Sequence, residues 1–487
     1  MKKFNMKKII YTIIAGAVSL CSFTSCSDWF DISPKTDVKA EELYETEYGF
    51  MSALAGIYVS MTEGAVYGGN LSFGMLDNLA QLYDRIPDGA TNRNDIYQYE
   101  RTTNGGYNTK DKLAQTWLKA YNLIANANNL LKWLDRNGDA VIANPETRNM
   151  LRGEALAIRA YVHFDLLRGW GPMGYAKDPS VRSERCIPYR VLPDNSKQPL
   201  LAAQDVVAKI ITDLEDAKEC LSYESEISLS DHENQDRRFR FNYHAVNAVL
   251  ARVYAYAGDA SHAMACAQDV IEHSGLELKN DNLNDPVLFA ETICGLNMYE
   301  MNDNLSSVFS IGDKINLQYY CDFTTLNTLY QISGTESEDM RAKTAAFYRS
   351  TDEQKAISRK YIDNDAEVIP LIRLPEMYYI LCEMSALEDA ASYINQVRNK
   401  RGLSVAQNET CSTEEARFEA LEREYRKEFY AEGQYFFFLK SRGFTGALLH
   451  SPEVSLDRVK YVFLLPDAEI EYGWAEESES ETEGEQN

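Results

Sequence analysis

Six residues at positions 169–174 match one pattern that is associated with chemistry. Gly169-Trp-Gly-Pro-Met-Gly174 reads as G-x-G-x-x-G, the glycine-rich loop that holds the pyrophosphate of a dinucleotide. That loop follows a strand and opens a helix, so that backbone amides point at the phosphates. Here an apolar helical pattern precedes the glycines, and Pro172 has no amide to offer. The segment is therefore predicted to be a helix stop and a turn.

Other catalytic motifs are absent from the sequence. The chain has no G-x-x-x-x-G-K-[ST], no G-x-S-x-G and no H-E-x-x-H. Its six histidines, at positions 163, 232, 244, 262, 273 and 450, lack the spacing of metal ligands. We therefore predict that the protein is not an enzyme and that it holds no metal or cofactor. Paired carboxylates for glycoside hydrolysis stay open as an alternative, because 74 acidic residues are present.

The N-terminus has the layout of a secretory signal peptide, which we assign to residues 1–25. Four lysines precede an apolar stretch at 9–20, which is shorter than the roughly 20 apolar residues that cross a bilayer. Phe23-Thr24-Ser25-Cys26 then resembles a bacterial lipobox, in which a peptidase cuts before a cysteine whose thiol carries diacylglycerol. Cys26 is the predicted lipidation site, and Cys21 is the competing candidate. A plain secretory signal with an incidental cysteine is the alternative.

Charge excludes two classes of partner. The chain has 49 Lys+Arg against 74 Asp+Glu, a formal net charge of −25, and loss of the four signal lysines leaves it near −29. Such a surface has no basic surplus to neutralise nucleic-acid phosphates. It also has none to attract anionic lipid, so any membrane attachment has to rest on the lipid at Cys26.

Seven cysteines remain besides Cys21 in the signal and the predicted lipidation site Cys26. Their odd number and the absence of a C-x-x-C spacing argue against a disulfide framework or a zinc site. Cys220, Cys266 and Cys382 fall within apolar helical patterns, and we expect them to be buried as small hydrophobic residues.

Hydrophobic residues recur at helical spacing along most of the chain. The predicted helices span residues 113–134, 147–168, 203–221, 243–257, 261–273, 372–388, 388–401 and 413–440. A turn at Gly258-Asp259 joins two of them, and Gly275 stands where a left-handed C-cap is expected. Alanines on both of these helices permit close approach. We therefore predict a tetratricopeptide-type helix pair there.

Long irregular segments separate the helices. Residues 62–110 mix glycine, asparagine and tyrosine, 171–200 are rich in proline, and 276–345 are polar with a predicted short strand at 307–310. Loops of this length within a compact body are usually functional or disordered. Residues 475–487 are predicted to be a disordered acidic tail.

One helix carries a family resemblance. Leu151-Arg-Gly-Glu-Ala-Leu-Ala-Ile-Arg-Ala-Tyr-Val-His-Phe-Asp-Leu-Leu-Arg168, followed by Gly169-Trp-Gly-Pro172, closely resembles the signature helix of the SusD/RagB family of Bacteroidetes nutrient-binding lipoproteins. Its polar positions are more simply read as structural ion pairs than as ligand contacts. These positions are Arg152, Glu154, Arg159, Asp165 and Arg168.

Other segments resemble the same family in the same order. They include Trp117-x3-Tyr121-x2-Ile124-x3-Asn128, the stretch from Asn242 to Asp259, and the segments that begin at Ile372, Ile394 and Arg426. Two departures stand out. Phe437-Phe438-Leu439 replaces the usual aromatic-Asp-Leu, and Pro375 stands where a helix former is preferred.

The resemblance implies a mainly α-helical fold with tetratricopeptide-like helix pairs as a scaffold, long irregular loops and little β structure. It places this fold in a single domain over residues 26–474. It also implies a lipid-anchored outer-membrane protein, exposed on the cell surface, that captures an oligosaccharide. The partner that it implies is a SusC-like TonB-dependent transporter, to which the sugar is delivered.

Sugar capture requires aromatic faces for stacking and polar groups at the rim. The long loops supply such residues, and these are the candidate ligand-binding residues: Tyr83, Arg85, Tyr97, Tyr99, Tyr299, Tyr319 and Tyr320. For each tyrosine, the competing interpretation is that the ring packs against the scaffold with a solvated hydroxyl.

Three other functions stay open. The protein could belong to a peptide-capturing, RagB-like branch of the same family. It could be an adaptor of tetratricopeptide units that binds only protein, or a glycoside hydrolase. Binding measurements with polysaccharides and peptides separate these alternatives.

Overall fold

The computed structural model describes residues 40–84, 109–306, 308–309, 319–334, 337–352, 354–362, 365–448 and 451–473. Several predictions fall outside these residues. They are the signal peptide at 1–25, the lipidation site Cys26, the loop residues Arg85, Tyr97 and Tyr99, and the acidic tail at 475–487. Within the described ranges the chain is mainly helical, as predicted.

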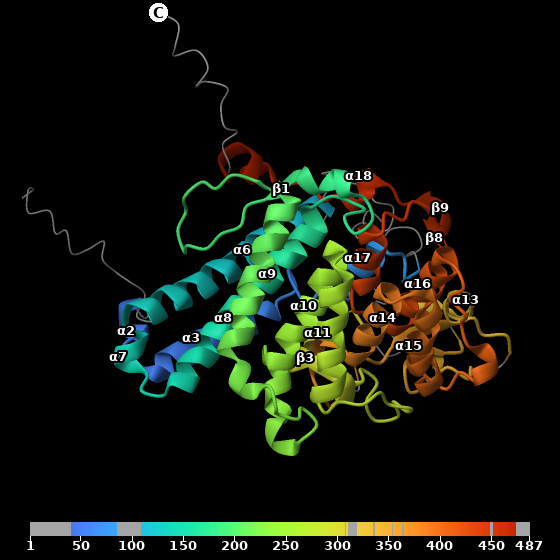
Figure 1. Ribbon diagram of the computed structural model, residues 1–487. Helices are drawn as coiled ribbons and strands as arrows, with labels where there is room; N and C mark the ends of the chain where they lie inside the picture. The colour runs from blue at the N-terminus through green and yellow to red at the C-terminus, as the bar shows by residue number, and fades with distance from the viewer. Residues whose placement is uncertain are drawn as a thin grey trace, which may run out of the picture.

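The first part of the chain builds a layer of long helices. Short α2 (Ala40–Leu43), α3 (Glu47–Met61) and α4 (Met75–Leu79) precede α6 (Thr109–Trp133), α7 (Asp139–Val141), α8 (Pro145–Trp170) and α9 (Ala203–Cys220). The Asn144 side chain caps α8 by accepting from the Glu146 amide at 2.9 Å, and Pro145 occupies its first turn. Helix α8 packs between α6 and α9 (Figure 1).

The predicted tetratricopeptide-like pair is confirmed. Helices α10 (Tyr243–Ala257) and α11 (Ala260–His273) are joined at Gly258, whose φ of 78° is left-handed. The side chains of Asn242 and Asp259 cap the two N-termini. Gly275 also has a left-handed φ, of 72°, as its C-cap position predicts.

The helix stop at Gly169–Gly174 is confirmed as well. Helix α8 ends at Trp170, and the Gly171 amide donates to the Leu167 carbonyl at 2.7 Å. The Trp170 indole then donates to the Leu464 carbonyl at 2.9 Å. A helix therefore precedes the glycines where a dinucleotide loop would need a strand.

The carboxy-terminal helices differ in part from the prediction. Helices α14 (Leu374–Met384) and α15 (Leu387–Lys400) form a pair, and α16 (Glu414–Glu428) is followed by α17 (Gln434–Ser441). A continuous helix over 413–440 is wrong, because Ala431 and Gly433 have φ of 64° and 74° and turn the chain. Pro375 is compatible with the fold, since it lies in the first turn of α14.

Strands in the described ranges are short. They are β1 (Arg185–Ile187), β2 (Leu201–Ala202), β3 (Thr292–Asn297), β4 (Cys321–Asp322), β5 (Phe347–Ser350), β6 (Lys355–Ser358), β7 (Val368–Arg373), β8 (Ala447–Leu448) and β9 (Ser451–Ser455). The antiparallel pair β3–β7 is fully buried except at Asn297. Residues 372–373 therefore belong to a strand and not to the predicted helix. Val308 and Phe309 form a turn after α12 (Met301–Leu305), whereas Ser307 and Ser310 lie outside the described residues.

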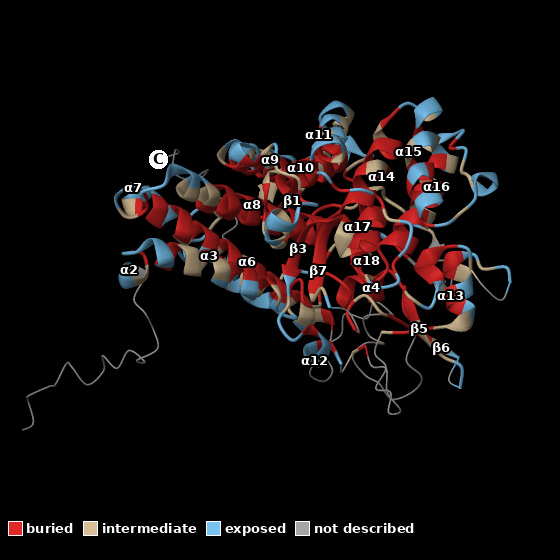
Figure 2. Ribbon diagram, turned by 90° about the horizontal axis from the view of Figure 1, so that it is seen from below, coloured by how far each residue is buried: buried red, intermediate tan, exposed pale blue. Residues whose placement is uncertain are grey.

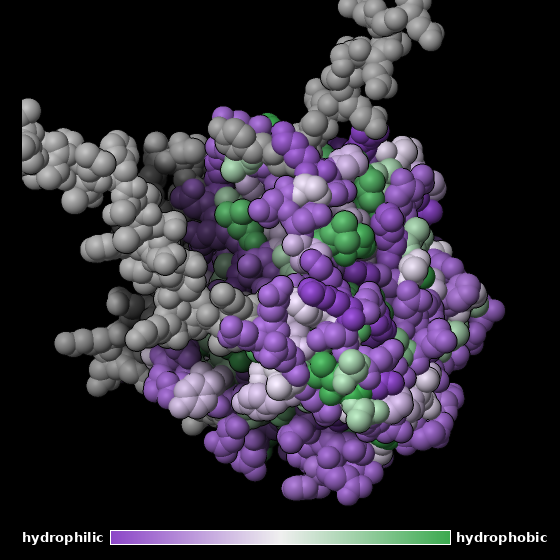
Figure 3. All heavy atoms as spheres, turned by 90° about the vertical axis from the view of Figure 1, so that its left-hand side faces the viewer, coloured by the Kyte–Doolittle hydropathy of each residue, from purple (hydrophilic) through white to green (hydrophobic). Residues whose placement is uncertain are grey.

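Buried residues concentrate where α8, α17 and the β3–β7 pair meet (Figure 2). The face that carries α3 and α6 is mostly hydrophilic, and its hydrophobic residues form small separate patches (Figure 3). Among the described helices, none has the length and apolar character needed to cross a membrane. Two smaller helices, α13 (Phe323–Tyr330) and α18 (Arg458–Tyr461), complete the set.

The cysteines of the described ranges are free thiols. Cys266 and Cys382 are buried as predicted, whereas Cys220 is only half-buried. Burial raises the pKa of the Cys186 thiol to about 12, so this thiol stays protonated and unreactive at neutral pH.

Candidate functional site

Asp84 joins the two long loops that the sequence marks as candidates. Its amide donates to the Tyr320 carbonyl at 2.9 Å, and its carboxylate accepts from the Thr325 hydroxyl at 2.8 Å and from the Asp322 amide. The first loop is thereby tied to the start of α13. Residues 238 and 241 positions apart in sequence thus meet in one place.

An aromatic cluster lies at this junction. The rings of Tyr83 and Tyr319 are 5.0 Å apart at an interplanar angle of 30°, and Tyr83 also meets Tyr430 at 5.5 Å. Phe73 contacts Phe309 at 5.3 Å and lies beneath Tyr319 at 6.1 Å. Such offset and edge-on contacts fix each ring in place. Tyr319 therefore packs against three rings of the cluster, those of Phe73, Tyr83 and Phe309.

The structure places the predicted tyrosines differently from one another. Tyr83 has no exposed surface, and its hydroxyl donates to the Phe73 carbonyl at 2.9 Å. Tyr319 is half-buried at the edge of the cluster. Tyr320 is buried, with the Lys355 ammonium 4.7 Å from its ring centroid. Tyr299 is 75% exposed in the turn between β3 and α12.

The structure thus brings Tyr83, Tyr319 and Tyr320 together, and it places Tyr299 in a separate turn. Tyr83 acts from the interior as a support for Tyr319. Asp84 is a residue that sequence reasoning missed. Its neighbour Tyr83 was visible as an aromatic residue in a long loop, but no local pattern marks a carboxylate that reaches a segment so distant in sequence.

The cluster rests on the turn between α16 and α17. Tyr361, whose ring is 4.9 Å from Phe73, donates its hydroxyl to the Ala431 carbonyl at 2.7 Å. The Gly433 amide donates to the Asp77 carboxylate at 3.0 Å. Burial raises the pKa of Asp77 well above its usual value. These contacts connect the aromatic cluster to the helices beneath it.

Below this turn lies a buried ion network centred on Glu428. Its carboxylate accepts from Arg341 at 3.0 Å, Arg373 at 2.8 Å and Arg401 at 2.9 Å. Arg401 also reaches Glu291 at 2.6 Å. Burial opposes the ionised form of Glu428, but the three arginines hold its pKa well below the usual value. The network ties α16 to α15, β7 and the loop before β5.

The polar positions of α8 are structural, as predicted. Arg159 forms a two-bond pair with Asp213 at 2.6 Å, and Arg168 pairs with Asp165 and donates to Gln434 at 2.8 Å. Glu154 accepts from Arg237 at 2.7 Å, and Arg152 pairs with Asp135 at 2.6 Å. These side chains hold helices together and leave little capacity for a ligand.

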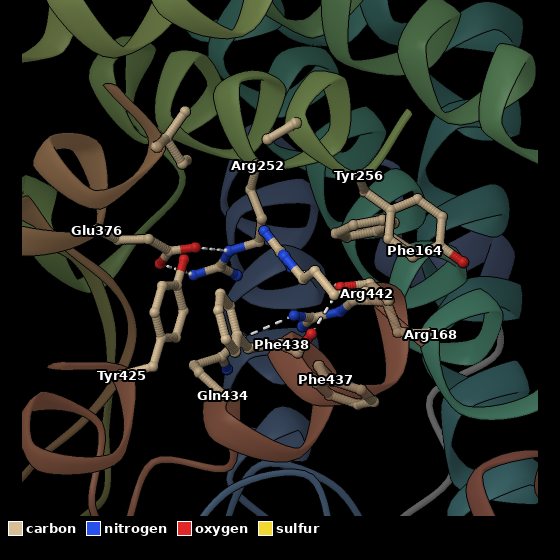
Figure 4. Close-up of a pocket in the computed structure, with 13 residues that line it drawn as sticks. Phe164, Arg168, Arg252, Tyr256, Glu376, Tyr425, Gln434, Phe437, Phe438 and Arg442 are labelled. Atoms are coloured by element: carbon tan, nitrogen blue, oxygen red, sulfur yellow. Dashed lines mark hydrogen bonds and ion pairs between the residues drawn. The ribbon is translucent and has the colours of Figure 1, made fainter. Parts of the chain in front are cut away.

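An interior cavity of about 30 Å³ lies where α8, α10, α14 and α17 converge (Figure 4). Its walls include Arg168, Arg252, Glu376, Gln434 and Arg442, and Arg252 forms a two-bond pair with Glu376 at 2.6 Å. This volume suits a water molecule and excludes a sugar ring. Within the described ranges, no group of three or more His, Cys, Asp or Glu side chains is arranged to hold a metal ion.

Two family models match consecutive parts of the chain. One, described as starch-binding and associating with the outer membrane, matches residues 28–255. The other, the SusD family, matches residues 278–440. The two matches follow the order of the helices described above.

Similar proteins are found by sequence and by structure. A SusD-like protein of Bacteroides ovatus is 25% identical over 63% of this chain, and a SusD-like protein of Formosa agariphila is 27% identical over 36% of it. The chain spans 54% and 33% of their lengths. A SusD superfamily structure from Bacteroides thetaiotaomicron has a TM-score of 0.71 at 20% identity, covering 88% of this chain and 98% of that one. A putative sugar-binding protein from Bacteroides vulgatus has a TM-score of 0.67 at 21% identity, covering 88% and 96%. These two structures share the fold.

Proposed function

Because the chain belongs to the SusD/RagB family, we propose that it captures an oligosaccharide at the cell surface and delivers it to a SusC-like TonB-dependent transporter. Family membership supports a nutrient-binding role, and the sugar and the transporter are parts of the proposal. The protein would bind and release its ligand without cleaving it.

The single observation that carries the proposal is the junction at Asp84. It joins two loops, and Tyr319 is the half-buried member of the aromatic cluster there. A sugar ring offers a flat C–H face that stacks on an aromatic ring, and its hydroxyls need polar groups nearby. We assign the stacking to Tyr319. Arg85, Tyr97 and Tyr99 continue the first loop from the same junction and remain candidates for the rim.

The other predicted tyrosines have different proposed roles. Tyr83 would fix the orientation of Tyr319, since the two rings are 5.0 Å apart and Tyr83 is fully buried. Tyr320 would form the part of the proposed site that lies next to Lys355. Tyr299, exposed in its own turn, would meet only a ligand long enough to extend beyond the cluster.

Attachment to the outer membrane would rest on an acylated Cys26. A single lipidated cysteine suits this strongly acidic chain, whose charge does not attract anionic lipid. Cys26→Ala should release the protein from washed membranes and abolish lipid labelling. Labelling that persists in this variant would move the anchor to Cys21 or elsewhere.

Isothermal titration against polysaccharides and peptides tests the ligand class. We expect heat with at least one neutral glycan and no released reducing sugar. Tyr319→Ala should weaken that binding about tenfold, the equivalent of about 1.4 kcal/mol. Tyr48→Ala is the matched control, because Tyr48 is 82% exposed on α3 and makes no part of the site.

Other outcomes would change the assignment. Heat with peptides alone indicates the peptide-capturing branch of the family. Turnover of any glycan contradicts the binding role, and the absence of heat with any small ligand favours a protein adaptor. Co-purification of a large outer-membrane transporter with the tagged, membrane-bound protein tests the delivery step, and its absence would contradict that step alone.

A further inference from the structure

A hollow on the surface shares no residue with the Tyr319 junction. It has a volume of about 640 Å³ and lies between the first turns of α16, the side of α17 and the loop that follows each of α8 and α17. Three phenylalanines line it, namely Phe418, Phe438 and Phe444. The volume is within the range of small-ligand sites, which is roughly 300–1,000 Å³.

The phenylalanines belong to a row of stacked rings that runs from the interior to the surface. Tyr425 and Phe438 are buried and stack at 4.2 Å and 21°. Phe418 follows Phe438 at 5.8 Å and 12°, and Phe444 follows Phe418 at 6.1 Å and 23°. Phe418 and Phe444 are half-buried, so the outer end of the row reaches the hollow.

Phe438 is one of the departures seen in the sequence, since it stands where the family pattern has Asp. In this chain the Arg442 guanidinium lies 4.3 Å above the Phe438 ring and pairs with Glu383 at 2.9 Å. Cation–π contact and ion pairing together fix Arg442 in place. Arg442 therefore packs over Phe438, the buried ring in the floor of the hollow.

The rim of the hollow is polar and exposed. Glu415 and Glu419 stand on the α16 side, and Lys177 comes from the loop after α8. Arg417 is already engaged, because it pairs with Glu414 and donates to the Ser385 carbonyl at 2.7 Å. Glu419 pairs with Arg423 at 3.9 Å, so Glu415 and Lys177 are the rim groups assigned to the hydroxyls of a ligand.

We propose that this hollow is a second binding site for a neutral saccharide unit, with ring stacking on Phe444 and Phe418 and hydroxyl contacts to Lys177 and Glu415. A sugar ring has C–H groups that stack on aromatic rings and hydroxyls that bind polar or charged side chains. The phenylalanines and the charged rim of the hollow offer both kinds of contact. The exposed glutamates disfavour a uronic or sialic acid unit by like-charge repulsion. This inference rests on the proposed glycan-binding function and extends it from one site to two.

Saturation-transfer NMR with maltotriose, cellotriose, xylotriose and mannotriose tests this site. Each sugar is titrated into the wild-type protein, Tyr319→Ala, Phe444→Ala and the double variant. We expect the signal of at least one sugar to persist in Tyr319→Ala and to fall at least threefold in Phe444→Ala. The double variant should give no saturation-transfer signal with that sugar.

Two further variants separate a loss of binding at this site from a loss of the folded structure. Lys177→Met changes only an exposed rim residue and should lower the same signal about twofold or more. Val459→Ala is the matched control, because Val459 is 69% exposed on α18 and lies outside both sites. Far-UV circular dichroism confirms that each variant is folded.

A signal that is lost in Tyr319→Ala and unchanged in Phe444→Ala and Lys177→Met overturns the second site while the proposed function stands. If trigalacturonate binds more strongly than every neutral sugar and Phe444→Ala abolishes that binding, the proposal that the ligand is a neutral saccharide is overturned. Binding of peptides alone at this hollow overturns the saccharide assignment. The absence of signal with all four sugars in the wild-type protein, together with no heat in the titrations above, removes both proposals.

Discussion

Helices α10 and α16 each have 15 residues and both are buried against neighbouring helices, but different forces hold them. Helix α10 buries mainly alanine, valine and leucine, with a smaller polar part that includes Arg252, which pairs with Glu376. Helix α16 reads EEARFEALEREYRKE, a sequence typical of a solvated surface, yet it buries Glu424 and Glu428 among arginines. Apolar contacts tolerate small shifts, whereas a buried carboxylate needs its partners at defined positions. The helix that leads into the turn beneath the aromatic cluster is the ionic one.

The largest effect should come from breaking the ion network at its centre. Glu428→Gln removes the charge that Arg341, Arg373 and Arg401 share in the interior. We expect the free energy of unfolding to fall by about 3–5 kcal/mol, because three buried arginines lose the carboxylate that they share and keep only their outer partners, which are Asp339, Glu424, Glu432 and Glu291. Urea unfolding measures this, with Glu419→Gln as control, since Glu419 is 68% exposed on the same helix. A loss below about 1 kcal/mol would contradict the role of the network.

This contrast explains what the sequence could predict. Helices with regular hydrophobic spacing can be predicted to within a few residues: the spacing predicts 147–168, and α8 spans Pro145–Trp170. Buried charges look like a surface face, so Glu428 and its partners could not be recognised. The turn after α16 was missed for a related reason. Ala431 adopts a φ of 64°, a conformation imposed by the surrounding contacts and not marked by residue type.

At the candidate site, too, one part could be predicted from the sequence and another could not. Long tyrosine-bearing loops were recognisable from composition, and the structure joins two of them at Asp84. Which tyrosine reaches the surface depends on ring packing, so Tyr83 and Tyr319 could not be told apart by sequence.

The second prediction concerns pH. Burial alone would raise the pKa of Glu424, but Arg341, Lys427 and Arg398 lower it to about 2 from 4.5. Because the folded state binds this proton more weakly than the unfolded one, the stabilisation is complete above pH 4.5 and is lost as the pH falls toward 2. The change amounts to roughly 3 kcal/mol. Urea unfolding from pH 6 to 2.5 measures it, and Glu424→Gln should flatten that slope; an unchanged slope would count against the assignment.

The third prediction concerns the packing of α8 against α9. A Cβ added at Gly153 on α8 would lie 2.7 Å from Leu221 Cγ and 3.1 Å from the Ala217 carbonyl oxygen. Gly153→Ala should therefore destabilise the protein by about 1–3 kcal/mol through overpacking against α9. Gly56→Ala is the control, because Gly56 is exposed on α3 with open space around it. That control should be neutral or stabilising by up to about 1 kcal/mol. Equal effects at both glycines would show that α8 and α9 can move apart freely.

The smallest effect should be at an exposed ion pair. Arg458 reaches Glu184 at 2.5 Å, but the two side chains are 56% and 34% exposed. Arg458→Ala should cost at most about 1 kcal/mol in urea unfolding, and added salt should reduce the difference further. A cost as large as that of Glu428→Gln would remove the distinction between buried and exposed pairs.

A crystal structure of the protein with the oligosaccharide that gives the strongest titration heat tests the central claim most directly. The account predicts a sugar ring stacked on the face of Tyr319, at the junction that Asp84 closes between the two loops. A sugar bound elsewhere, with Tyr319 free of any ligand contact, would contradict it.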